Sequence, residues 1–478
     1  MKFTAQVLSQ EEQIRVHEES LLILSEVGVK YFGEKALPIL KKAGAKVDEG
    51  NKIARIPKEM VEEALAAAPK TFVLGARNPA YDYPVPSPVT RYCADGTAAF
   101  VQDYVTGEKR YGTTKDIEQA LRVFQQMDMG VMAWAPVAAS ETPAHSRALH
   151  EFFAMIRTCS KHGEHELHFK NQIPYLIEGL KAVMGGEAEV RKRHAYSLIY
   201  CPVAPLMHDG EMLDAYLELG QLDMPVMIMP MPVVGTTGPA SLFANVCVAN
   251  AEDLSSIVIY ELAHPGRPVI HSNATGTMDF RNGAYLGGSP EMGLMAAAMT
   301  QMGRFYNLPT SSAGCTSDAK QPGPEAVLEK FITTLPPVTA GADIIVGLGE
   351  IESDQLLVLE QLVMDNELAH DCERMFNGID SGAGKALFAV IQQVGPGGNF
   401  LKSRNTRAAA RSGEFYYPDL IDRHTYEVWE KMGHPTMYTK AREKVEEILA
   451  APLADPLPET VNQELERILA AADEELKD

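Results

Sequence analysis

The sequence predicts an α/β fold: a (β/α)8 TIM barrel with a small N-terminal α+β appendage and C-terminal helices. Two observations favour this class. The chain has 478 residues, which is more than one ordinary core can use unless the fold is a large barrel with attachments. Between residues 91 and 355, short β-rich runs alternate with helical stretches, as expected when parallel strands need helical crossovers. Eight such alternations match a closed barrel in count and length.

Residues 1–90 are expected to form the appendage. A capping box begins at Ser9, and a helical pattern then continues to Gly28. Residues 45–57 have the pattern of a β-hairpin, and Pro57 then opens another helix at its first turn. These short elements precede the barrel pattern, so we place a boundary near residue 90.

The barrel strands are expected in eight short runs, with helices such as 250–263 and 325–334 between them. An open, doubly wound sheet would show a similar alternation, but no G-x-G-x-x-G motif follows any run, so its dinucleotide-binding version has no support. Residues 356–478 are mainly helical and are expected to wrap around the outside. The expected strands lie within 97–105, 130–139, 162–169, 195–203, 225–232, 267–275, 308–315 and 342–349.

Composition and charge limit the classes of partner. The chain has 64 acidic and 43 basic residues and a formal net charge of −21, which would repel a phosphate backbone, so we expect no nucleic-acid partner. No signal-like apolar core stands at the start, and no run approaches a membrane span, so no membrane partner is expected. The six cysteines form no C-x-x-C pair, which is typical of reduced thiols in a cytoplasmic protein.

In a barrel of this kind the chemistry gathers at the carboxyl ends of the strands and in the loops that follow them. The side chains there include sulfur, a few aromatic rings and single hydrogen-bonding groups, and no glycosidase-like carboxylate pair stands out. Asp318 is the candidate catalytic residue, because it can orient a neighbour or balance substrate charge; a turn stabilised by loop Asp bonding is the alternative. The candidate substrate-binding residues are Trp134, His168, Met229, Met231, His271, Asn273, Lys320 and Glu350.

This lining suits a soft, cationic ligand. An aromatic face such as that of Trp134 attracts a quaternary ammonium group, and Met229 and Met231 can surround its methyl groups, while Lys320 could hold a carboxylate. Ordinary filling of the barrel is the alternative role for both methionines, since methionine often fills irregular gaps.

Three closely spaced histidines, His162, His165 and His168, resemble a metal site. If this segment is a strand, alternation sends His165 to the face opposite His168, so the three rings cannot all converge. Zinc usually needs three or four protein ligands in one place. A metal-dependent TIM-barrel hydrolase built on this cluster is therefore the alternative function, and we expect no metal here.

Several segments together resemble the trimethylamine methyltransferase family, in its branch without pyrrolysine, which includes glycine betaine:corrinoid methyltransferases. The resemblance covers nearly the whole chain, and the order and spacing of the segments are more specific than any one of them. They include HEESLLILSEVGVKY (17–31), VQDYVTGEKRYGTTKD (101–116), VANAEDLSSIVIYELAHPGRPVIHS (248–272), MDFRNGAYLGGSPEMGLM (278–295), AGCTSDAKQPGPEAVLEK (313–330), LEQLVMDNEL (359–368) and GPGGNFLKSRNTRAAAR (395–411).

The resemblance implies a methyltransferase that moves a methyl group from a quaternary amine, most simply glycine betaine, to the Co(I) corrinoid (cobalamin) of a partner protein. A tertiary amine such as dimethylglycine would be released. The chain itself would bind no cofactor tightly, and copies of it are expected to associate. The methylamine enzymes of the family carry pyrrolysine, whereas this chain uses only the twenty standard residues, which favours a quaternary substrate over trimethylamine. A betaine-binding module without turnover is a further alternative.

Overall fold

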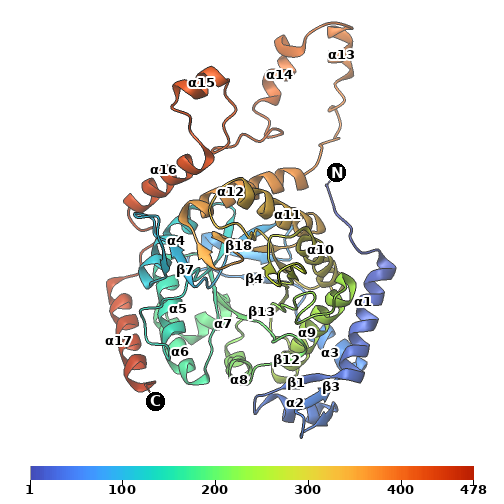
Figure 1. The fold of residues 1–478 in the computed structure, drawn as a ribbon, viewed down its shortest axis with the longest axis vertical. Helices are drawn as coiled ribbons and strands as arrows, with labels where there is room; N and C mark the ends of the chain where they lie inside the picture. The colour runs from blue at the N-terminus through green and yellow to red at the C-terminus, as the bar shows by residue number, and fades with distance from the viewer. Residues whose placement is uncertain (1, 478) are drawn as a thin grey trace.

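The computed structural model describes residues 2–477 and contains a closed eight-stranded parallel barrel (Figure 1). The strands neighbour one another in the order β14, β13, β11, β10, β9, β6, β18, β17, and a parallel bridge between His271 and Thr310 joins the two ends. The predicted fold class is therefore confirmed. The barrel strands are β6 (Arg91–Ala94), β9 (Gly130–Trp134), β10 (His162–His165), β11 (Tyr196–Tyr200), β13 (Val226–Ile228), β14 (Val269–His271), β17 (Ser311–Ala313) and β18 (Ile344–Leu348).

Seven of the expected strand runs contain a barrel strand, but the run at 97–105 does not. The first strand is β6, whose last three residues, Tyr92 to Ala94, are buried as parallel barrel strands require. Residues 97–105 instead contain β7 (Phe100–Gln102), which pairs antiparallel with β8 (Lys109–Tyr111) and alternates between half-buried and buried positions. That alternation marks a sheet with one solvated face, so the prediction for the first strand was wrong.

A helix follows each barrel strand and covers the outside of the barrel, so the order is that of a complete (β/α)8 fold. The expected helices at 250–263 and 325–334 are both present within longer helices. The covering helices are α4 (Thr114–Gln126), α5 (Arg147–Thr158), α6 (Ile173–Met184), α8 (Gly210–Leu219), α9 (Leu242–Ala263), α10 (Pro290–Phe305), α11 (Pro324–Ala340) and α12 (Leu359–Phe376).

The three helices of the N-terminal part pack against α9. The predicted capping box is present, because the Ser9 side chain accepts from the Glu12 amide and the Glu12 carboxylate accepts from the Ser9 amide. The predicted hairpin is formed by β2 and β3, and β1 joins it to Met207–His208 (β12) in the middle of the chain. The elements are α1 (Gln10–Leu22), β1 (Val29–Tyr31), α2 (Ala36–Ala43), β2 (Lys46–Asp48), β3 (Ile53–Arg55), α3 (Lys58–Ala67), β4 (Phe72–Leu74) and β5 (Tyr83–Val85).

One helix, α9, is long and apolar enough to cross a membrane by length and composition alone, with a mean hydropathy of 1.4. In this structure 83% of that segment is buried, and α9 packs against α1, α3 and α10. We therefore describe it as a core helix of the barrel layer.

The C-terminal part contains α13 (Phe388–Val394), α14 (Arg404–Ala409), α15 (Tyr426–Lys431), α16 (Met437–Ala450) and α17 (Glu459–Glu475). Helix α16 packs on α4 and α12, and α17 packs on α5 and α6. The stretch that carries α13, α14 and α15 instead projects away from the barrel (Figure 1). The division of the chain near residues 90 and 355 stays a prediction.

Candidate active site

A cavity of about 320 Å³ lies at the carboxyl ends of the barrel strands. Its size lies at the lower end of the range for small-molecule sites. All eight barrel strands, or the loops that follow them, contribute to its walls, so the cavity occupies the mouth of the barrel, where sites of this fold are found. One lining residue from each strand or following loop is Thr97, Trp134, Glu166, Cys201, Met229, Ala274, Ala313 and Val346.

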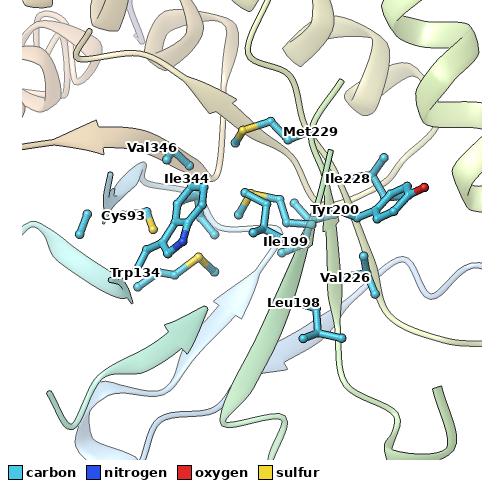
Figure 2. Packing of buried hydrophobic residues seen from close by; sticks show 14 of the residues in the cluster. Cys93, Trp134, Leu198, Ile199, Tyr200, Val226, Ile228, Met229, Ile344 and Val346 are labelled. Carbon is cyan, nitrogen blue, oxygen red and sulfur yellow. The ribbon is translucent and has the colours of Figure 1, made fainter. Parts of the chain in front are cut away.

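The indole of Trp134 forms the aromatic wall and is held in place on two sides. Its Nε1–H donates a hydrogen bond to Oε2 of Glu166 at 2.9 Å, and the Thr97 hydroxyl donates to Oε1 of the same carboxylate at 2.8 Å. A Cβ atom on Gly96 would lie 2.5 Å from the indole ring, so only glycine allows this close packing. Figure 2 shows Trp134 with Cys93 and Val346 on one side of the strands, while Tyr200 points the other way.

Glu166 is the ionised carboxylate of the cavity. Burial raises its pKa, but the charges of His165 and His168 and the hydrogen bonds from Thr97 and Trp134 lower it more, and the net shift is downward. Conversely, burial lowers the pKa of His165, but the carboxylates of Glu166 and Glu151 outweigh it and the net shift is upward. His165 Nδ1 lies 3.5 Å from Glu166 Oε2, and the two shifts both favour the charged forms of these neighbours.

A second group of carboxyls lies on another side of the cavity. Asp95 follows β6, Asp354 lies in the turn between β19 (Glu350–Ile351) and β20 (Leu356–Leu357), and both line the cavity. Burial, and then the charge of Asp354, hold the pKa of Asp95 well above its usual range, and burial also raises the pKa of Asp354. The burial of both groups and the repulsion between their charges thus favour the protonated form of Asp95.

A buried cation lies next to this acidic group. Lys330 Nζ donates to Asp365 Oδ2 at 2.9 Å and to the Gly347 carbonyl at 3.1 Å. Its charge lowers the pKa of Asp95, against the larger effect of burial. Because Lys330 is fully buried and satisfied by these partners, it stabilises the acidic side without facing the cavity.

The cavity is thus suited to a small, methyl-bearing cation. It combines an aromatic face, three sulfur atoms from Met212, Met229 and Met231, one carboxylate whose pKa is lowered and two carboxyls whose pKa values are raised. Among the described residues, no Lys or Arg lines it, and His168 is the one lining side chain that can carry a positive charge.

A family model described as trimethylamine methyltransferase (MTTB) matches residues 2–476. The chain belongs to the trimethylamine methyltransferase family. It is therefore a methyltransferase, and its relatives of known name cover it almost completely.

The chain is 32% identical over 477 residues to the trimethylamine methyltransferase MttB of Methanosarcina thermophila, with 96% of each chain covered. It is 27% identical over 472 residues to the glycine betaine methyltransferase of Desulfitobacterium hafniense strain Y51, with 98% of each covered. The crystal structure of the Methanosarcina barkeri monomethylamine methyltransferase MtmB matches with 12% identity and a TM-score of 0.46, covering 91% of this chain and 92% of that one.

Four of the residues predicted for substrate binding in this methyltransferase line the cavity: Trp134, His168, Met229 and Met231. Met229 is buried, whereas Met231 is 43% exposed, so the two thioethers extend from the wall to the rim. Their strand is shorter than expected. β13 ends at Ile228, before Pro230, because proline cannot donate to the strand ladder.

Asp318 and Lys320 lie outside the cavity lining. Asp318 accepts hydrogen bonds from the amides of Gly287 and Gly288 at 2.8 and 3.1 Å, and from the Ser353 hydroxyl at 2.6 Å. It therefore joins two loops and fixes the turn that carries the neighbouring Asp354. Lys320 is exposed and bonds to the Asp318 carbonyl, so no contact with the cavity supports a role for it in holding a carboxylate.

The other three predicted residues are buried away from the cavity lining. His271 Nε2 lies 3.3 Å from Asp253 of α9, and burial lowers its pKa to about 3. Asn273 donates to the Ser312 hydroxyl at 3.2 Å. Glu350 has no partner for either carboxylate oxygen, and burial, followed by the charges of Asp95 and Asp354, raises its pKa. Glu350 thus lies near Asp95 and Asp354 but does not line the cavity.

The three histidines of 162–168 do not converge, as the alternation predicted. His162 contacts the Gly75 carbonyl through Nδ1 at 2.7 Å, His165 faces Glu151 of α5, and His168 lies exposed at the rim. Among residues 2–477, no group of three or more His, Cys, Asp or Glu side chains could hold a metal ion.

Inside the barrel, Glu164 takes part in a buried polar chain. The Ser197 hydroxyl lies 2.9 Å from both Glu164 Oε2 and His162 Nε2. Burial raises the pKa of Glu164 to about 8 and lowers that of His162 to about 4. A neutral carboxyl that donates to Ser197, which donates to a neutral imidazole, gives each of these two contacts one donor, while Glu164 Oε1 has no hydrogen-bond partner.

Most of the lining residues had not been chosen as site residues from the sequence, among them the polar Asp95, Thr97, Glu166 and Asp354. The strand at 91–94 would have pointed to Asp95 and Thr97, and strict alternation beyond β10 places Glu166 at the mouth. No such pattern in the sequence points to Asp354, because it does not directly follow a barrel strand but lies after β19, which comes after the last barrel strand.

Proposed function

We propose that this methyltransferase transfers a methyl group from a quaternary amine to the Co(I) corrinoid of a partner protein and releases a tertiary amine. Glycine betaine is the first candidate substrate. The observation that carries the proposal is the cavity at the barrel mouth, where the Trp134 face and the thioethers of Met229 and Met231 adjoin carboxylates and no Lys or Arg is among the described lining residues. Family membership supports the reaction type, and the name of one relative supports the substrate.

The proposed reaction needs no general acid or base. The C–N bond breaks, its electron pair stays on nitrogen, and the leaving group is a neutral tertiary amine that needs no proton. The corrinoid supplies the electron pair that forms the new bond to carbon. The residues of this chain would bind the cation, exclude water and direct one methyl group toward the opening, which is catalysis mainly by positioning.

A substrate carboxylate would have two partners in this cavity. His168 lies at the rim, and Asp95, whose pKa burial and the charge of Asp354 hold well above its usual range, would present a protonated carboxyl that can donate to an anion. Lys320 is too peripheral for that role. A quaternary amine without a carboxylate, such as choline, is therefore an informative comparison for glycine betaine.

The test uses the purified full-length chain with chemically reduced free cobalamin as the methyl acceptor. Glycine betaine, proline betaine, choline and trimethylamine are supplied separately. We expect loss of the Co(I) absorption and equimolar dimethylglycine with glycine betaine, and no reaction with trimethylamine. Unchanged Co(I) with every quaternary amine would reject the proposal if the glycine betaine methyltransferase relative reacts under the same conditions.

The two alternatives have separate tests. Calorimetric binding of glycine betaine without any demethylation would favour a binding module. Stoichiometric metal in protein purified without chelator would favour a metal-dependent hydrolase. We also propose a cytoplasmic location, because all six cysteines are unpaired and a reducing compartment keeps such thiols and Co(I) intact.

A further inference from the structure

A row of three ionisable side chains extends from the outside of the barrel to the cavity. Glu151 lies on α5, His165 ends β10, and Glu166 follows directly. His165 Nε2 lies 3.2 Å from Glu151 Oε2, and its Nδ1 lies 3.5 Å from Glu166 Oε2. Glu151 and His165 are buried, and of the three only Glu166 lines the cavity. The imidazole therefore lies between two carboxylates, one of which faces a bound ligand.

Both carboxylates are held in place by other donors. Glu151 Oε1 accepts a hydrogen bond at 2.8 Å from the amide of Ala139, in the loop that follows β9. Glu166 accepts hydrogen bonds from Trp134 at 2.9 Å and from Thr97 at 2.8 Å. Because neither carboxylate is free to move away, the position of the imidazole between them is fixed.

The contact between His165 and Glu166 depends on charge. Among the described residues, His165 Nδ1 has no hydrogen-bond partner, so its attraction to Glu166 at 3.5 Å is that of opposite charges. Such an attraction is stronger in a buried place than in water. A neutral imidazole would leave Glu166 without its nearest buried cation.

Glu164, two residues earlier, shows how burial acts on a carboxyl inside this barrel. Burial raises the pKa of Glu164 to about 8, although Ser197 lies within hydrogen-bond distance. Burial raises the pKa of Glu166 too, but the charge of His165 is the largest of the effects that lower it, and the net shift is downward. The charge on the cavity wall therefore depends on His165.

The other titratable side chains near Glu166 come from β10, from the ends of β10 and β11, and from α8. His168 is exposed at the rim, where water and salt screen its charge. Burial raises the pKa of Glu164 to about 8 and that of Cys201 to about 12, and it raises the pKa of Tyr216 well above its usual range. Near neutral pH these three groups favour their uncharged forms, so they do not replace the charge of His165.

We propose that Glu151 and His165 are positioning residues that hold Glu166 as an ionised carboxylate at the cavity, so that the site selects a cationic substrate over an analogue with an uncharged carbon in place of the nitrogen. The inference rests on the proposed function for the nature of the substrate. Two carboxylates and one imidazolium leave a single negative charge, which balances the one positive charge of a quaternary ammonium. Neither Glu151 nor His165 lines the cavity, so both act through Glu166.

The first test needs no ligand, so its result does not depend on the proposed function. Histidine-selective NMR of the full-length protein measures the pKa of the His165 imidazole, whose signal is assigned by its loss in His165→Gln. Glu151→Gln and Glu166→Gln each remove one neighbouring carboxylate. Each should lower the pKa of His165 by about one pH unit or more, because burial then outweighs the remaining attraction. A pKa of His165 that neither variant changes would overturn the proposal.

The second test measures the binding of glycine betaine and of 3,3-dimethylbutanoate, its uncharged-carbon analogue, by calorimetry near pH 6.5 and pH 9. The wild type should bind glycine betaine more tightly. In His165→Gln this preference should fall by about tenfold or more at the lower pH, since a Glu166 with a pKa like that of Glu164 must lose a proton before it attracts a cation. At the higher pH the preference should recover toward that of the wild type.

Three results of the binding test would overturn the proposal: a wild type without the preference, a folded His165→Gln that keeps it, or a loss that is the same at both pH values. The last result would show a structural role alone. Circular dichroism checks that each variant is folded.

His162→Gln is the matched control. It makes the same change to another buried histidine of β10, which contacts the Gly75 carbonyl and the Ser197 hydroxyl, and it should keep the wild-type preference at both pH values. No methyl transfer enters either test. Unchanged Co(I) in the cobalamin assay would therefore reject the proposed reaction without deciding these two measurements.

Discussion

Replacing Trp134 with leucine should weaken the binding of a quaternary ammonium far more than that of a ligand of the same shape whose nitrogen is replaced by an uncharged carbon. The indole face lines the cavity, and its Nε1–H holds Glu166 at 2.9 Å. Leucine keeps an apolar side chain at the end of β9 but removes both the π face and this donor. Glu166 would keep its hydrogen bond from Thr97 and its contact with His165, so its carboxylate should keep its position in the cavity wall.

The magnitude follows from the position of the ring. A desolvated cation over a tryptophan face gains about 1 to 2 kcal/mol, which corresponds to roughly 5- to 30-fold in the dissociation constant. Trp134→Phe keeps a ring but loses the donor, so we expect an intermediate effect. The ligand without the positive charge should lose only the packing contribution, and this loss should be the same for both ligands.

The assay is isothermal titration calorimetry with glycine betaine and with its carbon isostere, 3,3-dimethylbutanoate. The two share the carboxylate and the methyl groups and differ only in the positive charge. The change in their affinity ratio between wild type and Trp134→Leu isolates the cation term. An unchanged ratio, with both ligands weakened equally, would show that the indole is only a hydrophobic wall and would refute the reasoning.

Three further predictions concern single residues. Burial raises the pKa of Glu164 to about 8, so on raising the pH the unfolded chain loses this proton before the folded chain does, and the free energy of unfolding falls between about pH 4.5 and pH 8. In denaturant titrations of Glu164→Gln this fall should be shallower by up to about 1.4 kcal/mol per pH unit. Equal slopes in the two proteins would contradict this. Lys330→Met leaves Asp365 buried without its cation and should lower the unfolding free energy by about 3 to 5 kcal/mol, whereas Lys330→Met with Asp365→Leu should recover part of it. Gly96→Ala places a Cβ 2.5 Å from the indole and should reduce kcat/KM without unfolding the chain, while Gly323→Ala, which meets no atom within 4 Å, should leave kcat/KM unchanged.

The strand pattern predicted the fold well because barrel strands are short, apolar and separated by helices. The error at 97–105 arose because β6 is four residues long and begins with Arg91, so its composition is less apolar than that of the hairpin that follows it. Burial on both faces, which only the folded chain reveals, distinguishes them.

The site was predicted in part for a similar reason. The rule that strand ends line the mouth located Trp134, Met229 and Met231, which come directly at or after their strands. It failed for His271, which ends β14 but turns toward Asp253 on α9, because a shift of one residue moves a side chain to the opposite face of a strand. It could not locate Asp354, since a turn outside the barrel carries it.

The burial of α9 has a consequence for how much of this chain can be removed. The Ser20 hydroxyl of α1 donates to the Cys247 carbonyl at 3.0 Å and accepts from Asn250 at 2.9 Å, so the N-terminal layer both covers this apolar helix and satisfies its polar groups. A truncated protein that starts at the first barrel strand would expose the apolar surface of α9 to water. Expression of the barrel alone should therefore yield insoluble material, however complete its catalytic mouth.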